Sequence, residues 1–431
     1  MNQSDKPYKW TLVCMACDSV HGALPFYDRC ECGGLLDVTH DWSERQIRRE
    51  DFHAHEAPSY GAHRSGVWRY RELILPIPMD DVVSRGEGAT NLYESPRVAK
   101  YCGLSQLLLK HEGENPTGSF KDRGMAVAIT AARLVGAKAV ACASTGNTSA
   151  SLAAYAAVAD LPAIVFVPKG GVTQEKMSQA VAYGARVVQV AGNFDDCMRL
   201  VEQVSLDCSV KLLNSLNPFR IEGQKTIAFE LAEQLGWNVP DWVVLPGGNL
   251  GNSSAIAKAF VELYELKLID RLPRLAIIQA RGANPLAHAF ATQEDVQPVD
   301  HPKTIATAIS IGNPVSVPRC LRGLDRCGGI AIDVDDSEIL EAKAMVDASG
   351  IGAEPASCAT VAGARKLVAD GVIAPSESVC GILTGNLLKD TQNALHAAKL
   401  RSGDNGTTEE GRVVKASLQE VRTAVQEALD H

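Results

Sequence analysis

The sequence predicts an α/β fold with two doubly wound parallel-sheet domains and a small cysteine-rich segment at the N-terminus. Three observations predict it. Short apolar segments alternate with helical patterns from about residue 105 to residue 383. Polar or glycine-rich turns follow several of those apolar segments, where a strand gives way to a helix. The chain has 431 residues, which at ~150 residues per domain leads us to expect two or three domains.

Hydrophobic periodicity places the helices and strands along the chain. Apolar residues recur at helical spacing over 122–135, and Gly136 follows as a stop signal. Further helices are expected over 149–157 and 175–182 and from about residue 254. The expected strands are the short apolar segments 107–109, 139–142, 163–167, 187–190, 243–245, 276–279, 330–334 and 379–383. Strands that alternate with helices in this way form parallel sheets that are covered on both faces.

The order of these elements divides the chain into four parts. We expect a cysteine-rich ribbon at 1–45, a large domain built from 46–120 and 214–400, and a small domain at 121–213. A polar loop and a helix complete the chain at 401–431. Ser417 and Glu420 form a capping box for this helix, and its apolar stripe is expected to dock on the body of the protein.

The composition excludes several classes of protein. The net charge is −9, with 42 Lys and Arg residues against 51 Asp and Glu residues, so binding to nucleic acid or to an anionic membrane is not expected. The hydrophobic fraction of 46% argues against disorder. No apolar run is long enough to span a bilayer and the polar start of the chain holds no signal-peptide core, which predicts a cytoplasmic protein.

The twelve cysteines fall into two groups. Cys14 and Cys17 form a C-x-x-C pair, and Cys30 and Cys32 form a second, tighter pair that two glycines follow. Two such pairs can complete a tetrahedral zinc site, bound now or lost in ancestry, and the alternative is a disulfide or a set of free thiols. The other eight are expected to be small buried residues of a protein in a reducing compartment. They are Cys102, Cys142, Cys197, Cys208, Cys320, Cys327, Cys358 and Cys380.

The first segment that predicts chemistry is the polar loop 116–124, whose Lys121 stands at the opening of the helix 122–135. The positive end of the helix dipole disfavours the ammonium form of a lysine beside it. A lysine that forms a Schiff base needs such a lowered pKa. The alternative is an ordinary solvated lysine in the first helical turn.

A cluster of hydroxyls lies directly after the strand expected at 139–142. Five of the eight residues 144–151 carry hydroxyls, and one carries an amide. Where a strand ends and a helix begins, backbone N–H groups and hydroxyls converge on one point, which suits an anion or a carboxylate. N-capping by Thr148 or Ser149 is the simpler interpretation, but a cap needs only one such residue.

Three further turns indicate ligand contacts. The loop 247–253 is rich in glycine and follows an apolar strand, which favours phosphate binding, although it fits neither the dinucleotide fingerprint nor the Walker loop. The turn 214–220 carries Arg220 and several amides, enough for a second anion unless it is only a surface turn. Thr384 follows the strand 379–383, at the edge where open α/β sheets bind ligands.

Together these segments resemble the fold-type II family of pyridoxal-phosphate enzymes, from about residue 90 to residue 395. Within that family, GSFKDRG from residue 118, STGNTSAS from 144, NSLNPFRIEGQKT from 214 and GGNLGN from 247 are similar to the threonine synthases. The cysteine-rich segment that ends in CGGLLDV also resembles their N-terminus. Related serine and threonine dehydratases share the cores around the lysine and the asparagine, but carry a more uniformly glycine phosphate loop.

The resemblance implies a role for each residue. Lys121 would form a Schiff base with pyridoxal phosphate and shuttle protons, Asn147 would bind the phenolic oxygen of the cofactor, and Thr384 would face its pyridine nitrogen. The residues implied to hold the cofactor are Lys121, Asn147, Gly247, Gly248, Asn249, Leu250, Gly251, Asn252 and Thr384. The residues implied to bind the substrate are Ser144, Thr145, Thr148, Asn214, Ser215 and Arg220.

The implied reaction converts O-phospho-L-homoserine and water to L-threonine and phosphate by γ-elimination and β-hydration, in a chain expected to be a homodimer. One alternative in the same fold is a threonine or serine dehydratase or a cysteate synthase. Arg220 with its neighbours Asn214 and Ser215 argues against it, because a substrate without a phosphate would not need this group. An alternative from another class is a non-catalytic metal-binding protein built around the cysteines, and Lys121 with its surrounding motifs argues against that.

Overall fold

Three β-sheets organise the protein, whose computed structural model describes residues 9–22, 29–43, 46–53, 64–170, 174–192, 198–203, 209–402 and 413–429. The largest sheet has the strand order β12-β11-β10-β13-β5-β4. Its strands are β4 (Leu92–Glu94), β5 (Leu107–His111), β10 (Trp242–Pro246), β11 (Arg274–Ala280), β12 (Ile330–Val334) and β13 (Val379–Leu383). All neighbouring pairs are parallel except β4 with β5, so an antiparallel strand forms one edge.

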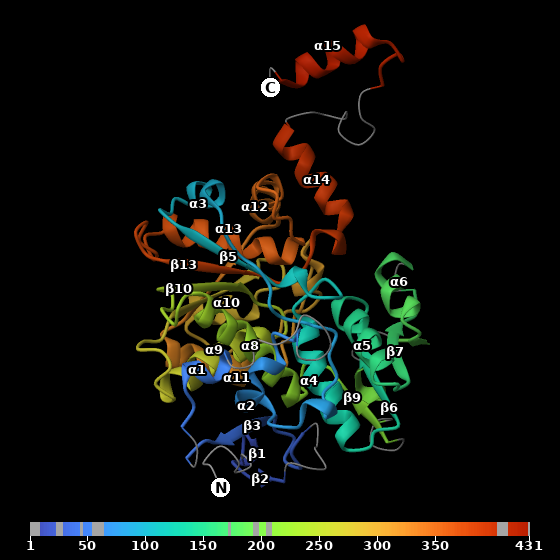
Figure 1. The fold of residues 1–431 in the computed structure, drawn as a ribbon, viewed down its shortest axis with the longest axis vertical. Coiled ribbons are helices and arrows are strands. Elements are labelled where there is room, and N and C mark those ends of the chain that lie inside the picture. The colour runs from blue at the N-terminus through green and yellow to red at the C-terminus, as the bar shows by residue number, and fades with distance from the viewer. Residues whose placement is uncertain are drawn as a thin grey trace.

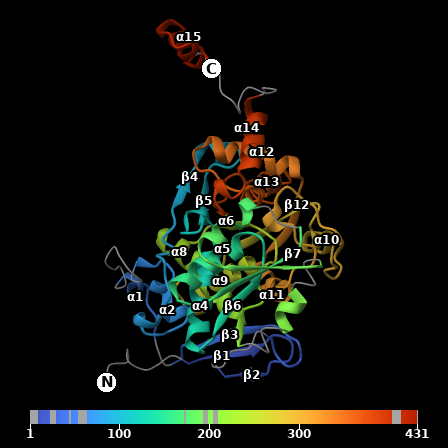
Figure 2. The ribbon, with the colours of Figure 1, turned by 90° about the vertical axis from the view of Figure 1, so that its right-hand side faces the viewer.

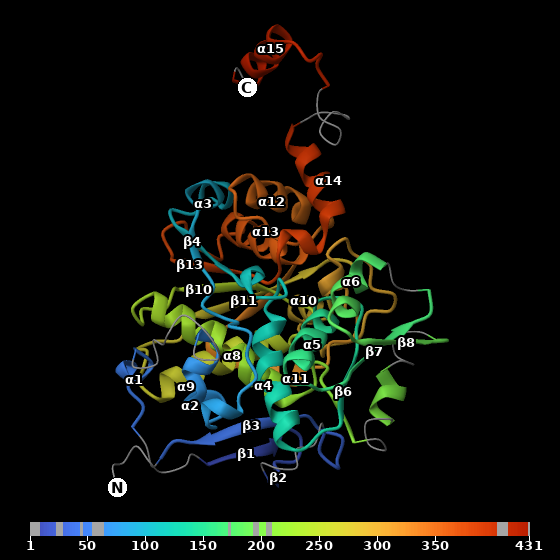
Figure 3. The ribbon, with the colours of Figure 1, turned by 45° about the vertical axis from the view of Figure 1, so that its right-hand side comes forward.

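The second sheet is fully parallel and has the order β8-β7-β6-β9. Its strands are β6 (Ala139–Ala143), β7 (Ala163–Pro168), β8 (Arg186–Val190) and β9 (Val210–Leu212). Every residue of the inner strand β6 is buried, whereas the edge strand β8 is largely exposed. Figure 3 shows this sheet beside the larger one, with helices α4 and α5 between the two.

Helices cover both sheets (Figures 1 and 2). The longer ones are α3 (Pro96–Cys102), α4 (Lys121–Leu134), α5 (Asn147–Val158), α6 (Gln174–Ala182), α8 (Pro218–Gln234), α9 (Gly251–Glu265), α10 (Pro285–Thr292), α11 (Val317–Cys327), α12 (Asp336–Ala348), α13 (Pro355–Ala369) and α14 (Thr391–Ser402). Shorter helical segments are α1 (Arg49–His53), α2 (Arg71–Ile74), η3 (Trp68–Tyr70), η4 (Met79–Asp81), η5 (Glu112–Glu114), η6 (Thr307–Ile309) and η7 (Leu387–Lys389). None of the described helices combines the length and apolarity that a membrane crossing requires.

The third sheet is small and antiparallel, and it belongs to the cysteine-rich segment. Its order is β2-β1-β3, with β1 (Lys9–Cys14), β2 (Val20–His21) and β3 (Leu36–Asp41). Strand β1 places Trp10 edge-on against Phe219 of α8, with 5.5 Å between the ring centroids. The ribbon therefore packs against the same helix that carries Arg220.

The predicted α/β fold with two doubly wound parallel-sheet units and a cysteine-rich N-terminal segment is confirmed. One boundary differs in an informative way, since α9 begins at Gly251 rather than near residue 254. Leu250 takes the left-handed conformation, with φ 62°, and precedes the first helical residue. The end of the glycine loop is therefore the first turn of a helix, and its free backbone N–H groups point outward from that end.

The last helix, α15 (Leu418–Leu429), does not dock as the sequence predicted. The N–H of Glu420 donates to Ser417 Oγ at 3.3 Å, as a cap requires, but the apolar stripe is exposed, with Val421 45% and Leu429 74% accessible. Figure 1 shows α15 standing apart from the body. Apolar residues at helical spacing predict a helix but do not identify the surface that covers them, so the helix was predicted correctly and its docking was not.

The scattered cysteines are buried as predicted wherever the structure describes them. Residues Cys197 and Cys208 lie outside the described residues. The ten described cysteines are all free thiols, which is typical of a reducing compartment.

Candidate active site

Main-chain hydrogen bonds join the loop of Lys121 to the loop that follows β13. The N–H of Phe120 donates to the carbonyl of Thr384 at 3.0 Å, and the N–H of Asn386 donates to the carbonyl of Gly118 at 2.9 Å. An isolated antiparallel bridge between Ser119 and Gly385 lies between these two bonds. Two segments that are far apart in the sequence therefore form one wall of a site at the carboxyl end of the large sheet.

Two glycines allow α4 and α8 to approach closely enough to bring Lys121 near Arg220. A Cβ on Gly223 would overlap the main-chain oxygen of Arg123, and a Cβ on Gly124 would lie 2.7 Å from the main-chain oxygen of Arg220. Neither contact is possible for a residue with a side chain unless the helices separate. Gly124 and Gly223 therefore determine how close α4 and α8 lie, and with that the distance between Lys121 and Arg220.

Lys121 is the first residue of α4 and is only partly exposed. Its pKa is lowered to about 7, mainly because burial disfavours the ammonium ion and secondly because Arg220 repels it, while Glu354 acts in the opposite direction. The Nζ atom lies 3.7 Å from the centroid of the Phe120 ring. Near neutral pH, Lys121 can therefore be either amine or ammonium, which suits both covalent bonding and proton transfer.

The residues after Lys121 lock the loop in place. Asp122 accepts hydrogen bonds at 2.6 Å from the N–H and the hydroxyl of Thr117 and from the hydroxyl of Ser151. On the other side, the Arg123 guanidinium bonds both oxygens of buried Glu112, at 2.6 and 2.7 Å. Buried ion pairs of this kind fix geometry more than they add stability.

The hydroxyl-rich segment lies where predicted, between β6 and α5. Gly146 precedes the helix, and Asn147 is its first residue. The amide nitrogen of Asn147 donates to both carboxylate oxygens of Glu354, at 3.1 and 3.3 Å. Ser144, Thr145 and Thr148 are partly exposed around this helix N-terminus, whose backbone N–H groups favour an anion.

Glu354 was not found from the sequence. It lies just before α13, it is buried, and burial raises the pKa of its carboxyl above the usual range. A Cβ on Gly385 would clash with the Glu354 carboxylate, so glycine at that position admits the acid to the site. A single glutamate before a proline matches no sequence motif, so only the buried position of Glu354 in the structure identifies it as a site residue.

Thr384 is buried beside a second residue that the sequence did not indicate. Its Oγ1 lies 3.0 Å from Ser357 Oγ, and the N–H of Gly385 donates to the same serine oxygen at 2.9 Å. Ser357 belongs to the first turn of α13. This helix therefore supplies a hydroxyl that holds Thr384 at the end of β13.

Arg220 is buried, with 1% of its surface exposed, in the first turn of α8. Its Nη1 donates to the carbonyl of Leu213 at 3.1 Å, whereas its Nε has no hydrogen-bond partner among the described residues. No carboxylate within that described part of the chain pairs with it. Burial lowers its pKa to about 10, so the protein keeps an uncompensated guanidinium at an energetic cost.

The side chain of the neighbouring Asn214, which is predicted to bind the substrate, bonds the main chain of β6. Its Oδ1 accepts from the N–H of Ala143 at 3.0 Å, and its Nδ2 donates to the carbonyl of the same residue at 2.9 Å. Both ends of the amide are thus bonded to the last residue of β6. Asn214 fixes the start of the hydroxyl-rich segment, while Ser215 stays partly exposed beside it.

Buried polar groups without partners gather at the N-terminus of α9. They are both amide atoms of Asn252, the hydroxyls of Ser253 and Ser316, and Oε1 of Gln224, each unpartnered among the described residues. A Cβ on Gly251 would lie 3.8 Å from Ser316 Oγ and 4.0 Å from Gln224 Oε1, which places these groups around that residue. Unpaired buried polar atoms are costly, so this cluster indicates a missing polar ligand.

Comparisons with known proteins agree with this geometry. The family model of the pyridoxal-phosphate dependent enzymes matches residues 83–385, which is more than half of the chain. A threonine synthase of Methanocaldococcus jannaschii is 46% identical over 390 residues, covering 90% of this chain and 94% of that protein. One from Methanosarcina acetivorans is 45% identical over 417 residues, covering 96% of this chain and 98% of that protein.

The chain belongs to the threonine synthase family. It is therefore a pyridoxal-phosphate-dependent lyase, as the motifs predicted. A solved structure of the processed form of threonine deaminase isoform 2 from Solanum lycopersicum has a TM-score of 0.64 and 20% identity, over 78% of this chain and 93% of that one. That likeness supports the fold alone.

The residues present fit the cofactor of the threonine synthase family. Pyridoxal phosphate carries an aldehyde and a phosphate, and the structure supplies a lysine with a lowered pKa and a helix N-terminus ringed by unpartnered polar groups. A Cβ on Gly248 would lie 3.3 Å from the main-chain oxygen of Ala308 and from Cα of Ile309, so a glycine at this position lets η6 pack closely against the loop. Arg220 then remains available for a second anion.

Proposed function

We propose that the chain converts O-phospho-L-homoserine and water to L-threonine and inorganic phosphate. The observation that carries this proposal is Arg220, a buried guanidinium without a carboxylate partner among the described residues, beside Lys121. A planar guanidinium suits a phosphate group, which it can bond through two parallel N–H groups. The unpartnered groups at α9 account for the cofactor phosphate, so Arg220 is left for the phosphate of the substrate.

We assign the cofactor contacts as the family resemblance implies. Asn147 and Thr384 would meet the ring of pyridoxal phosphate, and the backbone of 247–252 would bind its phosphate. When bound, the cofactor supplies an electron-accepting ring that stabilises negative charge at carbon. Ser357 supports Thr384 from behind, and Glu354 sets the orientation of the Asn147 amide.

Lys121 is the group that would move protons. With a pKa near 7 it can take a proton at its Nζ and return it, which general acid–base catalysis at neutral pH requires. Its position is fixed by Asp122 and Arg123, whose bonds hold both sides of the first helical turn. Precise placement of one amine matters, because proton transfer needs the donor and acceptor atoms within hydrogen-bond reach.

Ser144, Thr145 and Thr148 are assigned to the carboxylate of the substrate. Their support is the helix N-terminus of α5, where free N–H groups and hydroxyls favour a negative charge. Ser215 and Arg220 would bind the phosphate at the other end. We revise the part of Asn214 to that of a positioning residue, since both of its amide atoms are bonded to Ala143.

A dehydratase is the second candidate in the same fold, and one assay separates the two. Purified protein with pyridoxal phosphate is incubated with O-phospho-L-homoserine, and released phosphate and L-threonine are quantified. L-Serine and L-threonine are tested in parallel for 2-oxo acid formation. Equal amounts of phosphate and threonine support the proposal. Efficient 2-oxo acid formation from serine, without phosphate release from the phosphorylated substrate, would replace it with the dehydratase.

We also propose that the protein is a cytoplasmic homodimer. The free state of the described cysteines supports the compartment, and the resemblance supports the oligomer. On the division into domains, the two parallel sheets support a large unit built from 46–120 and 214–400 and a small unit at 121–213. Light scattering of the purified chain tests the homodimer, and limited proteolysis tests the division into domains.

A further inference from the structure

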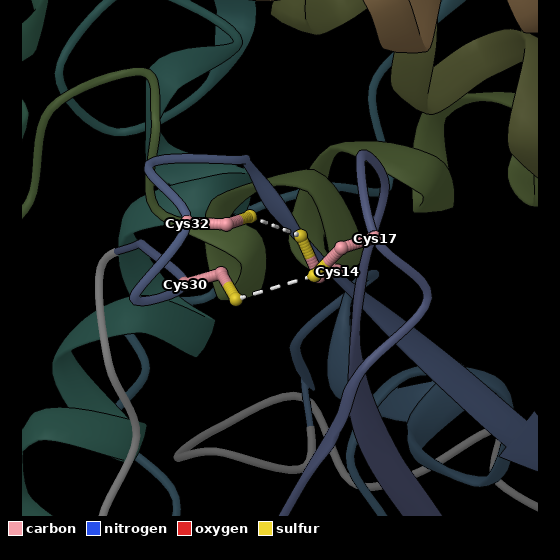
Figure 4. A group of neighbouring side chains, drawn as sticks. All are labelled: Cys14, Cys17, Cys30 and Cys32. Carbon is pink, nitrogen blue, oxygen red and sulfur yellow. Dashed lines mark hydrogen bonds between the residues drawn. The ribbon is translucent and has the colours of Figure 1, made fainter.

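The four N-terminal cysteines form a cluster that the proposed activity does not use. Cys14 and Cys17 flank the turn after β1, and Cys30 and Cys32 come from the turn before β3. Their sulfur atoms all lie within 4.8 Å of one another. Figure 4 shows the four side chains pointing toward a common centre from these two turns.

The spacing of the sulfur atoms matches a tetrahedral metal site. The distance between Cys14 Sγ and Cys32 Sγ is 3.5 Å, and that between Cys17 Sγ and Cys30 Sγ is 3.7 Å. A zinc–sulfur bond of about 2.3 Å in a tetrahedron gives sulfur–sulfur distances of about 3.8 Å. A disulfide would require about 2.05 Å, so neither pair is oxidised.

We propose that Cys14, Cys17, Cys30 and Cys32 bind one zinc ion as four thiolates. Four sulfur ligands in a tetrahedron select zinc or iron among the common metals. Binding releases the thiol protons to solvent, and no electron is transferred. Cys17 and Cys32 are exposed while Cys14 and Cys30 are buried, which leaves the metal a route of entry from one side.

The local structure supports the charge of such a site. The N–H of Ala16 points at Cys14 Sγ from 3.4 Å, and Ser19 Oγ lies 3.2 Å from the sulfur atoms of both Cys17 and Cys30. Donors around thiolates offset the net negative charge of a four-sulfur zinc centre. A Cβ on Gly34 would lie 2.6 Å from Cys14 Sγ, so the glycine after the second pair keeps the centre free.

The site has a structural role that its position explains. Met15, inside the first turn, and Leu35, just after the second, pack in one apolar cluster with Leu212 and Leu216. Those two leucines flank the turn of Asn214 that leads into α8. The metal thus ties together the two turns of the ribbon that support this segment from behind.

The test is the metal content of the purified full-length chain, kept reduced and free of chelator. We expect about one zinc per chain by elemental mass spectrometry. Replacement by cobalt should give the visible absorption of tetrahedral cobalt with sulfur-to-metal charge transfer. The zinc content and the cobalt absorption are both independent of pyridoxal phosphate and of turnover. The zinc proposal can therefore fail while the proposed activity is correct, and the proposed activity can fail while the zinc proposal is correct.

Matched variants complete the test. Cys17→Ser and Cys32→Ser should lose the zinc, whereas Cys327→Ala, at a buried cysteine outside the cluster, should keep it. If the serine variants do not fold, titration of the unmodified chain with a mercurial reagent should release zinc as the four ribbon thiols react. Three results would overturn the proposal. The chain purified from zinc-replete cells contains no metal, it contains iron instead of zinc, or the Cys17→Ser variant retains all of its zinc.

Discussion

Replacing Arg220 with Met should separate binding from stability. Methionine keeps much of the length of the side chain and removes the charge. If Arg220 is held in the fold to bind a phosphate, its loss should damage substrate use while leaving the folded chain intact. If it is a structural residue, the loss should damage both together.

The magnitudes follow from the surroundings of the guanidinium. A pKa lowered from 12.5 to about 10 means that burial costs the charged form roughly 3 kcal/mol. The hydrogen bond to the carbonyl of Leu213 returns about 1.5–3 kcal/mol. Arg220→Met should therefore change the free energy of unfolding by no more than about 1–2 kcal/mol, in either direction.

The effect on substrate should be far larger. Two charge-assisted hydrogen bonds to a phosphate are worth roughly 3–6 kcal/mol together, which corresponds to a loss of roughly 150- to 25,000-fold in kcat/KM. Affinity for pyridoxal phosphate should change by less than about threefold, because the loop at α9 binds that phosphate. The pKa of Lys121 should rise, because Arg220 no longer repels its ammonium form.

The assays are urea denaturation, titration of the cofactor and steady-state phosphate release. Arg123→Met is the matched control, because that equally buried arginine pairs with Glu112 and Glu230. The substitution removes the cation that pairs with buried Glu112 and one of the two that pair with Glu230, which should cost about 3–5 kcal/mol of stability. The reasoning is refuted if Arg220→Met unfolds as readily as Arg123→Met, or if it weakens cofactor and substrate to the same extent.

Three further predictions concern the positioning of the site. Lys121→Ala should abolish turnover, and borohydride should no longer attach the cofactor covalently to the chain, as measured by intact mass. In the cofactor-free chain, the rate at which acetic anhydride labels Lys121 should rise with pH around 7. A rise only near pH 10 would contradict the lowered pKa of Lys121. Gly223→Ala should cost about 1–3 kcal/mol in urea denaturation, because it separates α4 from α8, and unchanged stability would exclude that contact. Asn214→Ala should raise the KM for the phosphorylated substrate less than Arg220→Met does, and an equal rise would make Asn214 a direct phosphate ligand.

The local elements of this fold could be predicted because their signals are local. The strand 330–334 matches β12 residue for residue, and the helix expected at 122–135 differs from α4 by one residue at each end. Hydrophobic alternation and a glycine stop depend on neighbouring residues only. The start of α9 was placed three residues late because a left-handed Leu250 has no reliable sequence signal.

The partners of the candidate site residues could not be predicted. Glu354 bonds Asn147 from 207 positions away, and Ser357 supports Thr384 across 27. These side-chain contacts form only when the tertiary fold brings the two segments together. The sequence of either segment alone does not specify which other segment it will meet. The bonds of Asn214 show the same limit, because its amide is bonded to a strand that precedes it by 71 residues.

The sequence by itself determined the fold class, the reactive lysine, the anion-binding turns and the two cysteine pairs, since each is a short pattern with a local physical cause. Tertiary structure alone decided which groups these patterns meet. Burial lowered the pKa of Lys121, left Arg220 without a counterion among the described residues, and drew four sulfur atoms to within metal-binding distance. Desolvation and proximity are properties of packing, so they arise only when distant segments are brought together.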